Sequence, residues 1–89
     1  MKQIKIFTKN ECSKCPAAKE VGGRLQEEGA EVTYYDLETP DGLAEAAFYS
    51  VLATPTIIVE DEHDTIIAGW RGSVPDFPEI KKVIAERWN

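Results

Sequence analysis

Cysteine, histidine and long apolar runs are all scarce in this chain of 89 residues. Two cysteines are too few for a small domain held together by several disulfides. Together with one histidine, they also fall short of the ligands that a closed zinc site needs within one chain. No apolar run approaches the roughly 20 residues of a membrane-spanning helix. The first lysines are not followed by the apolar core of a secretion signal, so we expect a cytoplasmic protein.

Basic residues are also in deficit. Ten Lys and Arg residues stand against sixteen Asp and Glu residues, which gives a net charge of −6. An acidic surface repels phosphate backbones and anionic lipids, so we expect no binding to nucleic acid and none to membranes. Such a surface keeps a protein soluble, and it also leaves room for an electropositive protein partner. We expect a monomer.

What the chain does contain is typical of one globular domain spanning residues 1–89. Hydrophobic residues make up 43% of the sequence and charged residues 29%. These fractions are ordinary for a folded soluble domain, and the length allows a single modest core. No repeat, linker or low-complexity segment divides the chain.

Alternating and periodic apolar residues predict the order β-α-β-α-β-β-α. A helix begins at Pro16 and stops before Gly29, because proline suits a first helical turn and glycine a helix end. The two β-α-β passages predict right-handed crossovers and a parallel pair, and the short turn at 61–64 predicts an antiparallel hairpin. We therefore expect an α/β fold, a four-stranded mixed sheet with helices on both faces. The predicted strands cover residues 3–8, 32–37, 57–59 and 65–68, and the later helices cover 40–48 and the segment from 77 onwards.

Three local signals refine this pattern. Thr39 and Asp76 each precede a predicted helix and are suited to cap it. Gly22 and Gly23 lie inside the first helix, where they cost up to about 2 kcal/mol relative to alanine. Close packing of that helix on a neighbour could offset this cost.

The two cysteines, Cys12 and Cys15, lie between the first strand and the first helix, with two residues between them. A helix start stabilises a thiolate through its free N–H groups and its dipole. Lys9 and Lys14 add positive charge nearby. We expect Cys12 to sit just before the helix and to attack, and Cys15 to lie one turn further on, more shielded, and to resolve the mixed disulfide.

Other interpretations of the cysteine pair remain open at this point. Two cysteines at this spacing can be buried small hydrophobes, or half of a metal site shared with a partner. Small metal-carrying domains also place such a pair between a first strand and a first helix, but with the element order β-α-β-β-α-β. A redox-inactive interaction domain is a further alternative. The β-α-β pattern around the pair favours a redox role.

Two motifs together resemble the thioredoxin superfamily. Cys12-Ser13-Lys14-Cys15 follows the first strand, and Thr54-Pro55-Thr56 precedes the third. The resemblance implies a thioredoxin-like fold of the glutaredoxin type and the activity of a thiol–disulfide oxidoreductase. It also implies that the Thr54–Pro55 peptide bond is cis and faces the disulfide, and that Thr54 pairs with substrate backbone.

A third segment resembles one particular group within the superfamily. Trp70, Gly72, Pro75 and Asp76 are similar to the Trp-x-Gly-x-x-Pro-Asp pattern of the NrdH-type redoxins, the glutaredoxin-like hydrogen donors of ribonucleotide reductase. This implies electrons from NADPH through a flavoprotein of the thioredoxin reductase type. It also implies disulfide-containing protein partners, among them ribonucleotide reductase. Lys9 stands where glutaredoxins carry a glutathione-contacting lysine, so glutathione is the other candidate donor. No bound cofactor and no metal are expected.

The candidate site therefore has two parts. The catalytic residues are Cys12 and Cys15, and the substrate-binding candidates are Lys9, Thr54, Pro55, Trp70 and Asp76. Packing in the core is an equal alternative for Trp70, and we expect Trp88 to cover the core from the last helix. Ile6 stands where thioredoxins carry a buried aspartate, so no carboxylate is expected to take the proton of Cys15 by that route.

Overall fold

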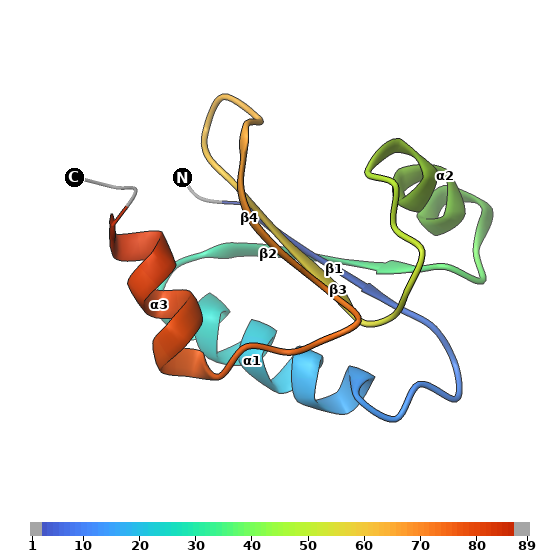
Figure 1. Cartoon of the computed structure of the whole chain (residues 1–89), viewed down its shortest axis with the longest axis horizontal. Coiled ribbons are helices and arrows are strands. Elements are labelled where there is room, and N and C mark those ends of the chain that lie inside the picture. Colours follow the sequence, from blue (N-terminus) through green and yellow to red (C-terminus); the bar gives the residue numbers. More distant parts are fainter. Residues whose placement is uncertain (1–2, 87–89) are drawn as a thin grey trace.

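The computed structural model of the chain describes residues 3–86, so the prediction for Trp88 lies outside the described residues. The elements follow the predicted order (Figure 1). Among the described residues, no helix has both the length and the apolar character needed to cross a membrane. The elements are β1 (Gln3–Thr8), α1 (Cys15–Glu27), β2 (Glu31–Asp36), α2 (Pro40–Phe48), β3 (Thr56–Glu60), β4 (Ile66–Arg71) and α3 (Phe77–Glu86).

The sheet is mixed, as predicted, with the strand order β2-β1-β3-β4. Strands β1 and β2 are parallel, while β1 with β3 and β3 with β4 are antiparallel. Only the first β-α-β passage is therefore a crossover between parallel strands, and the expectation of a second one was wrong. The short α2 lies at one end of the sheet, and the chain enters β3 from that same end (Figure 1).

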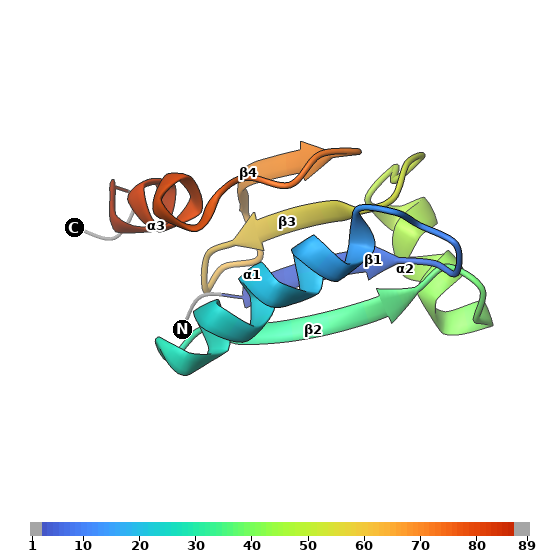
Figure 2. The ribbon, with the colours of Figure 1, turned by 90° about the horizontal axis from the view of Figure 1, so that it is seen from below.

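The helices cover both faces of the sheet, also as predicted. Helices α1 and α3 lie on one face and α2 lies on the other (Figures 1 and 2). Successive side chains of a strand alternate between the two faces. Ile4 and Ile6 of β1 thus join the core under α1 and α3, while Phe7 joins the core under α2. The guanidinium of Arg24 in α1 lies 4.0 Å from the ring centroid of Phe77 in α3, which links the two helices.

The predicted helix caps are present. The Thr39 hydroxyl accepts a hydrogen bond from the Gly42 N–H at 3.0 Å, and Pro40 occupies the first turn of α2. The Asp76 carboxylate accepts one from the Glu79 N–H at 2.9 Å at the start of α3. Gly29 follows the end of α1 at φ +95°, in the left-handed region that favours glycine. Local chemistry fixes where the helices begin and end.

The two adjacent glycines of α1, Gly22 and Gly23, differ in how closely other residues pack against them. A methyl group on Gly22 would collide with the Tyr34 ring and with Ile6, whereas one on Gly23 would meet nothing within 4 Å. Close packing of α1 on the sheet therefore explains Gly22, and nothing in the structure explains Gly23. The Tyr34 hydroxyl donates to the Lys19 carbonyl oxygen at 3.3 Å across this contact.

Candidate redox site

Cys12 and Cys15 form a disulfide at the loop between β1 and α1, with their Cα atoms 5.4 Å apart. Cys15 is the first residue of α1, so the expectation that it lies one turn inside the helix was wrong. The residues from Cys12 to Lys14 form a turn instead, in which the Cys15 N–H donates to the Cys12 carbonyl at 3.2 Å. Pro16 lies in the first turn, where its missing N–H costs no hydrogen bond.

The two sulfurs differ in accessibility. Cys15 is only 4% exposed, whereas Cys12 is half-buried. No side chain caps the start of α1, so its free N–H groups remain available to a negative charge at this end of the helix. This arrangement agrees with the predicted roles, because a partner can reach Cys12 but not Cys15.

A shallow hollow surrounds Cys12 and brings distant segments together. Thr54 lines it from the loop before β3, and Gly72 lines it from the end of β4. The structure therefore unites Lys9 and Thr54 with Cys12, as the site prediction requires. Two cations and one carboxylate share its wall, which makes this region less acidic than the chain as a whole. Its lining residues are Lys9, Glu11, Cys12, Ser13, Lys14, Thr54 and Gly72.

The Thr54–Pro55 peptide bond is cis, which confirms that prediction. Pro55 is fully buried, and its carbonyl oxygen accepts a hydrogen bond from the Gly72 N–H at 2.8 Å. Gly72 has φ +78°, a conformation that side chains rarely adopt. The Thr56 hydroxyl donates to the Ala53 carbonyl oxygen at 2.7 Å. The loop beside the disulfide is thus held from both ends.

Trp70 and Asp76, the remaining candidates, do not line this hollow. The Trp70 ring packs against the core under α1 and α3, and its indole N–H donates to the Glu79 carboxylate at 3.3 Å. Asp76 caps α3, as described above. Both residues therefore have packing or capping roles in the fold, and their contact with a substrate stays a prediction.

Known proteins resemble this chain over nearly its whole length. The family model described as "Thioredoxin domain" matches residues 2–85. The chain belongs to the thioredoxin domain family. A probable thioredoxin from Archaeoglobus fulgidus is 31% identical over 85 residues, which cover 94% of this chain and 87% of that protein.

Solved thioredoxin structures share the fold. Thioredoxin 1 from Thermosipho africanus has a TM-score of 0.78 at 19% identity, covering 96% of this chain and 92% of its own. Thioredoxin O2 from Arabidopsis thaliana in its oxidised state has a TM-score of 0.79 at 18% identity, covering 100% of this chain and 76% of its own. The thioredoxin-like fold and the superfamily resemblance are thus confirmed, while the finer glutaredoxin-type assignment stays a prediction.

The metal-carrier alternative differs from this thioredoxin-family domain in its order of elements. The order here has a helix between the second and third strands, which the β-α-β-β-α-β domains lack. Within residues 3–86, no group of three or more His, Cys, Asp and Glu side chains is placed to hold a metal ion. No observation therefore favours that alternative.

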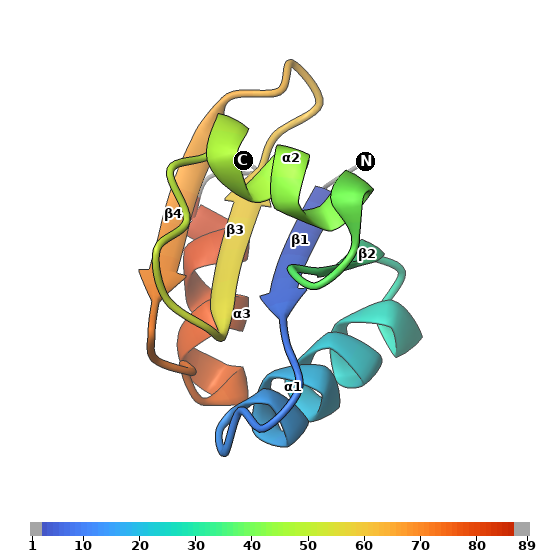
Figure 3. The same ribbon diagram turned by 90° about the vertical axis from the view of Figure 1, so that its right-hand side faces the viewer.

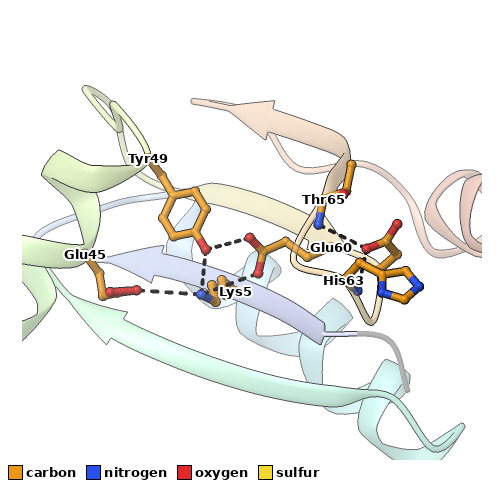
Figure 4. A network of polar contacts seen from close by, with 7 residues as sticks. Lys5, Glu45, Tyr49, Glu60, His63 and Thr65 are labelled. Atoms are coloured by element: carbon orange, nitrogen blue, oxygen red, sulfur yellow. Dashed lines mark hydrogen bonds and ion pairs between the residues drawn. The ribbon is translucent and has the colours of Figure 1, made fainter.

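A second polar cluster, on the α2 side of the sheet, escaped the sequence analysis (Figure 4). Its members are Lys5 of β1, Tyr49 at the end of α2 and Glu60 of β3. The Lys5 ammonium donates to the Tyr49 hydroxyl at 2.7 Å, and that hydroxyl donates to Glu60 Oε2 at 2.6 Å. The ammonium also lies 3.4 Å from Glu60 Oε1 and 3.6 Å from Glu45. A buried carboxylate is thus matched by a cation.

Burial and charge act on this cluster together. Burial tends to lower the pKa of Lys5, but the Tyr49 hydrogen bond and the Glu60 charge outweigh it and raise the pKa above the usual lysine range. Burial raises the pKa of Tyr49, and the hydrogen bond to Glu60 raises it further. In the sequence, the only signals of this cluster are Lys5, which stands between two isoleucines, and Glu60, which ends an apolar strand. Neither indicates that the two side chains meet.

Proposed function

We propose that this chain is a cytoplasmic thiol–disulfide oxidoreductase that reduces disulfides in partner proteins. One observation carries the proposal: the Cys12–Cys15 disulfide joins a half-buried sulfur to a buried one at the start of α1, beside the cis Thr54–Pro55 loop. Family membership supports it, because a Cys-x-x-Cys pair in this position is typical of redox-active members. A dithiol of this kind works in a compartment where thiols are kept reduced.

The reaction divides the work between the two cysteines. In the reduced protein, the Cys12 thiolate attacks one sulfur of a substrate disulfide, and the departing sulfur takes a proton from solvent. The Cys15 thiol then loses its proton to solvent and attacks Cys12 Sγ. This step closes the Cys12–Cys15 disulfide and releases the second substrate sulfur, which is also protonated. Two electrons have moved from the protein dithiol to the substrate.

The electron donor is part of the proposal. A thioredoxin-reductase-type flavoprotein that draws on NADPH fits the spacing of Trp70, Gly72 and Pro75 better than glutathione does. Glutathione needs fixed partners for two carboxylates and an amine. Lys9 is exposed, and a single exposed cation holds a carboxylate weakly. Ribonucleotide reductase is a candidate among the protein substrates on the same grounds.

Trapping variants test the roles of the cysteines. Cys15→Ser should accumulate a mixed disulfide with a protein substrate, because the resolving thiol is absent, while Cys12→Ser should be inert. Non-reducing gel electrophoresis with mass spectrometry of the linked peptide locates the sulfur involved. Trapping through Cys15 in the Cys12→Ser protein would reverse the assignment.

Insulin reduction tests the donor. The oxidised protein is supplied with either a thioredoxin reductase and NADPH or with glutathione at equal driving force, and the rate of insulin reduction is measured. We expect the flavoprotein to support the faster rate. A faster rate with glutathione that is lost in Lys9→Ala would contradict this part of the proposal.

A further inference from the structure

The segment that carries Cys12 lies outside the helices and strands. It runs from the end of β1 at Thr8 to the start of α1 at Cys15, and its residues 9–14 are exposed apart from the half-buried Cys12. An exposed segment of this kind has few packing contacts to restrain its backbone. Hydrogen bonds from other parts of the chain therefore decide where the Cys12 sulfur lies in its hollow.

A carboxylate from a distant part of the chain holds this segment. The Asn10 N–H donates to Glu38 Oε1 at 2.9 Å, although the two residues are 28 positions apart. Glu38 lies in the connection between β2 and α2, which adjoins the cysteine segment because the parallel strands β1 and β2 end at the same edge of the sheet. Figure 3 views the molecule from this end. A hydrogen bond to a carboxylate is roughly twice as strong as one between neutral groups.

The connection that carries Glu38 is itself well restrained. The Glu38 N–H donates to Asp36 Oδ1 at 2.8 Å. The N–H and the hydroxyl of Thr39 both donate to the Asp36 carbonyl oxygen, at 3.0 and 2.8 Å. Helix α2 approaches so closely that a Cβ atom on Gly42 would collide with that oxygen. The Glu38 carboxylate therefore extends from a fixed backbone.

Glu11, which follows Asn10, has a costly backbone conformation. Its φ is +57°, in the left-handed region that non-glycine residues seldom adopt. On its other side Cys12 is tied to α1, because the Cys15 N–H donates to the Cys12 carbonyl oxygen. Glu11 thus connects two fixed points. Release of the Asn10 N–H would let Glu11 relax and would move Cys12 with it.

The oxidation state decides how much this bond matters. In the oxidised protein the disulfide itself restrains Cys12. Reduction opens that link, and the bond from Asn10 to Glu38 then holds one side of the segment. The reduced protein is the form that attacks a substrate disulfide. Since a displacement of about 1 Å can slow a reaction by up to about 100-fold, the place of the Cys12 sulfur matters directly.

We propose that Glu38 is a positioning residue for the redox reaction: through the Asn10 N–H, its carboxylate keeps the reduced Cys12 at the start of α1. This inference rests on the proposed function and adds to it a residue that does not line the hollow around Cys12. The effect is geometric. The negative charge of a nearby carboxylate would by itself disfavour the Cys12 thiolate, so geometry and charge predict opposite results when Glu38 is changed.

Two variants of Glu38 separate geometry from charge. Glu38→Ala removes the acceptor, whereas Glu38→Gln keeps an acceptor oxygen at the same reach and removes the charge. Two properties of the reduced proteins are measured: the rate of insulin reduction in a single turnover, and the pH midpoint of Cys12 alkylation by iodoacetamide. We expect Glu38→Ala to be about fivefold slower, the effect of one lost hydrogen bond, with its midpoint at higher pH because the thiolate leaves the helix start. Glu38→Gln should keep the wild-type midpoint and a rate within about twofold.

Hydrogen exchange at the Asn10 amide tests the bond itself. Its protection in the reduced protein should be lost in Glu38→Ala and kept in Glu38→Gln. Glu31→Ala is the matched control, because Glu31 is an exposed glutamate at the opposite end of β2 from Asp36. The control should keep the wild-type rate, midpoint and protection. Urea unfolding of the oxidised Glu38→Ala protein shows whether the variant is folded.

Each other outcome overturns the inference. A midpoint that moves to lower pH in both Glu38 variants would mean that Glu38 acts through its charge. A wild-type rate and midpoint in Glu38→Ala would mean that Cys12 keeps its place without Glu38, and equal losses in both variants would mean that the acceptor oxygen is not what matters. If the wild type does not reduce insulin, the proposed function fails, while alkylation and hydrogen exchange still decide the role of Glu38.

Discussion

The two faces of the sheet are covered in different ways. Under α1 and α3 the fully buried residues are all aliphatic, with Trp70 and Phe77 packed at their margin, and two helices cover them. Under the single short helix α2 the core is partly aromatic: the ring centroids of Phe7 and Tyr35 are 5.2 Å apart, and Tyr49 packs beside Phe7. The buried residues of the first face are Ile4, Ile6, Ala18, Val21, Leu25, Ile57, Val59 and Ile80.

The difference follows from the length of α2, because side chains must cover the part of the face that this short helix does not shield. One helix of nine residues cannot shield a whole face, so Lys5, Tyr49 and Glu60 fill the remaining space with a charge-matched polar cluster. Glu60 is only 1% exposed, and a buried carboxylate depends on its cation. The α2 face should therefore be sensitive to charge and pH, and the α1/α3 face to volume.

The largest effect is expected from removing the cation on the α2 face. Lys5→Met leaves the Glu60 carboxylate buried without its cation, which should lower the free energy of unfolding by about 3–5 kcal/mol. Urea unfolding of the oxidised protein measures this. Lys5→Met combined with Glu60→Gln removes both charges and should be clearly less damaging than the single change. A loss under about 1 kcal/mol in Lys5→Met would show that solvent already compensates Glu60.

On the α1/α3 face the sensitive property is volume. Gly22→Ala places a methyl group against Tyr34 and Ile6 and should cost about 1–3 kcal/mol of unfolding free energy. Gly23→Ala is the matched control, because its methyl group meets nothing, and it should add about 0.5–1 kcal/mol through helix propensity. Thermal unfolding of both variants checks the prediction. Equal effects would mean that α1 shifts freely on the sheet.

Alkaline pH should act through Lys5 and Tyr49 on the α2 face and through Tyr34 beside α1, since burial also raises the pKa of Tyr34. Lys5 and Tyr49 both have a raised pKa in the folded protein, Lys5 because its bonds to Tyr49 and Glu60 outweigh burial, and Tyr49 because of burial and its bond to Glu60. Their stabilisation is complete below the unfolded values near pH 10 and is lost as pH rises through the folded ones. Unfolding free energy should fall above about pH 10, by up to about 1.4 kcal/mol per pH unit for each group.

Urea unfolding at a series of pH values from neutral to alkaline follows this loss. Tyr49→Phe removes one of the two titrating groups of the α2 face and should therefore reduce the slope above pH 10. An unchanged slope in that variant would place the alkaline sensitivity outside the α2 face.

The smallest effect is expected at Arg71, which connects the α2 face to the redox site. Arg71→Gln removes the bonds to the carbonyl oxygens of Tyr49 and Ser50 and should cost about 1 kcal/mol of stability. Because the loop that carries Thr54 loses an anchor, insulin reduction should slow while the rate with a small disulfide such as DTNB is retained. Equal slowing of both rates would indicate a general change around Cys12 instead.

Local chemistry made much of the fold predictable. The alternation of Ile4, Lys5 and Ile6 predicted β1, and the caps at Thr39 and Asp76 set the starts of two helices. The cis Thr54–Pro55 bond followed from the family resemblance and not from any local rule. The place of Cys15 was misjudged, because the residues from Cys12 to Lys14 form a turn and Cys15 is the first residue of the helix.

By itself, the sequence determined the element order, the helix limits, the acidic surface and the position of the cysteine pair. These depend on residues close together in the chain. The tertiary structure alone decided that Lys5 meets Glu60 and Tyr49, and that Thr54 and Gly72 lie beside Cys12. Side-chain periodicity shows which face a residue takes, but a buried charge finds its partner only when strands and helices distant in the chain pack together.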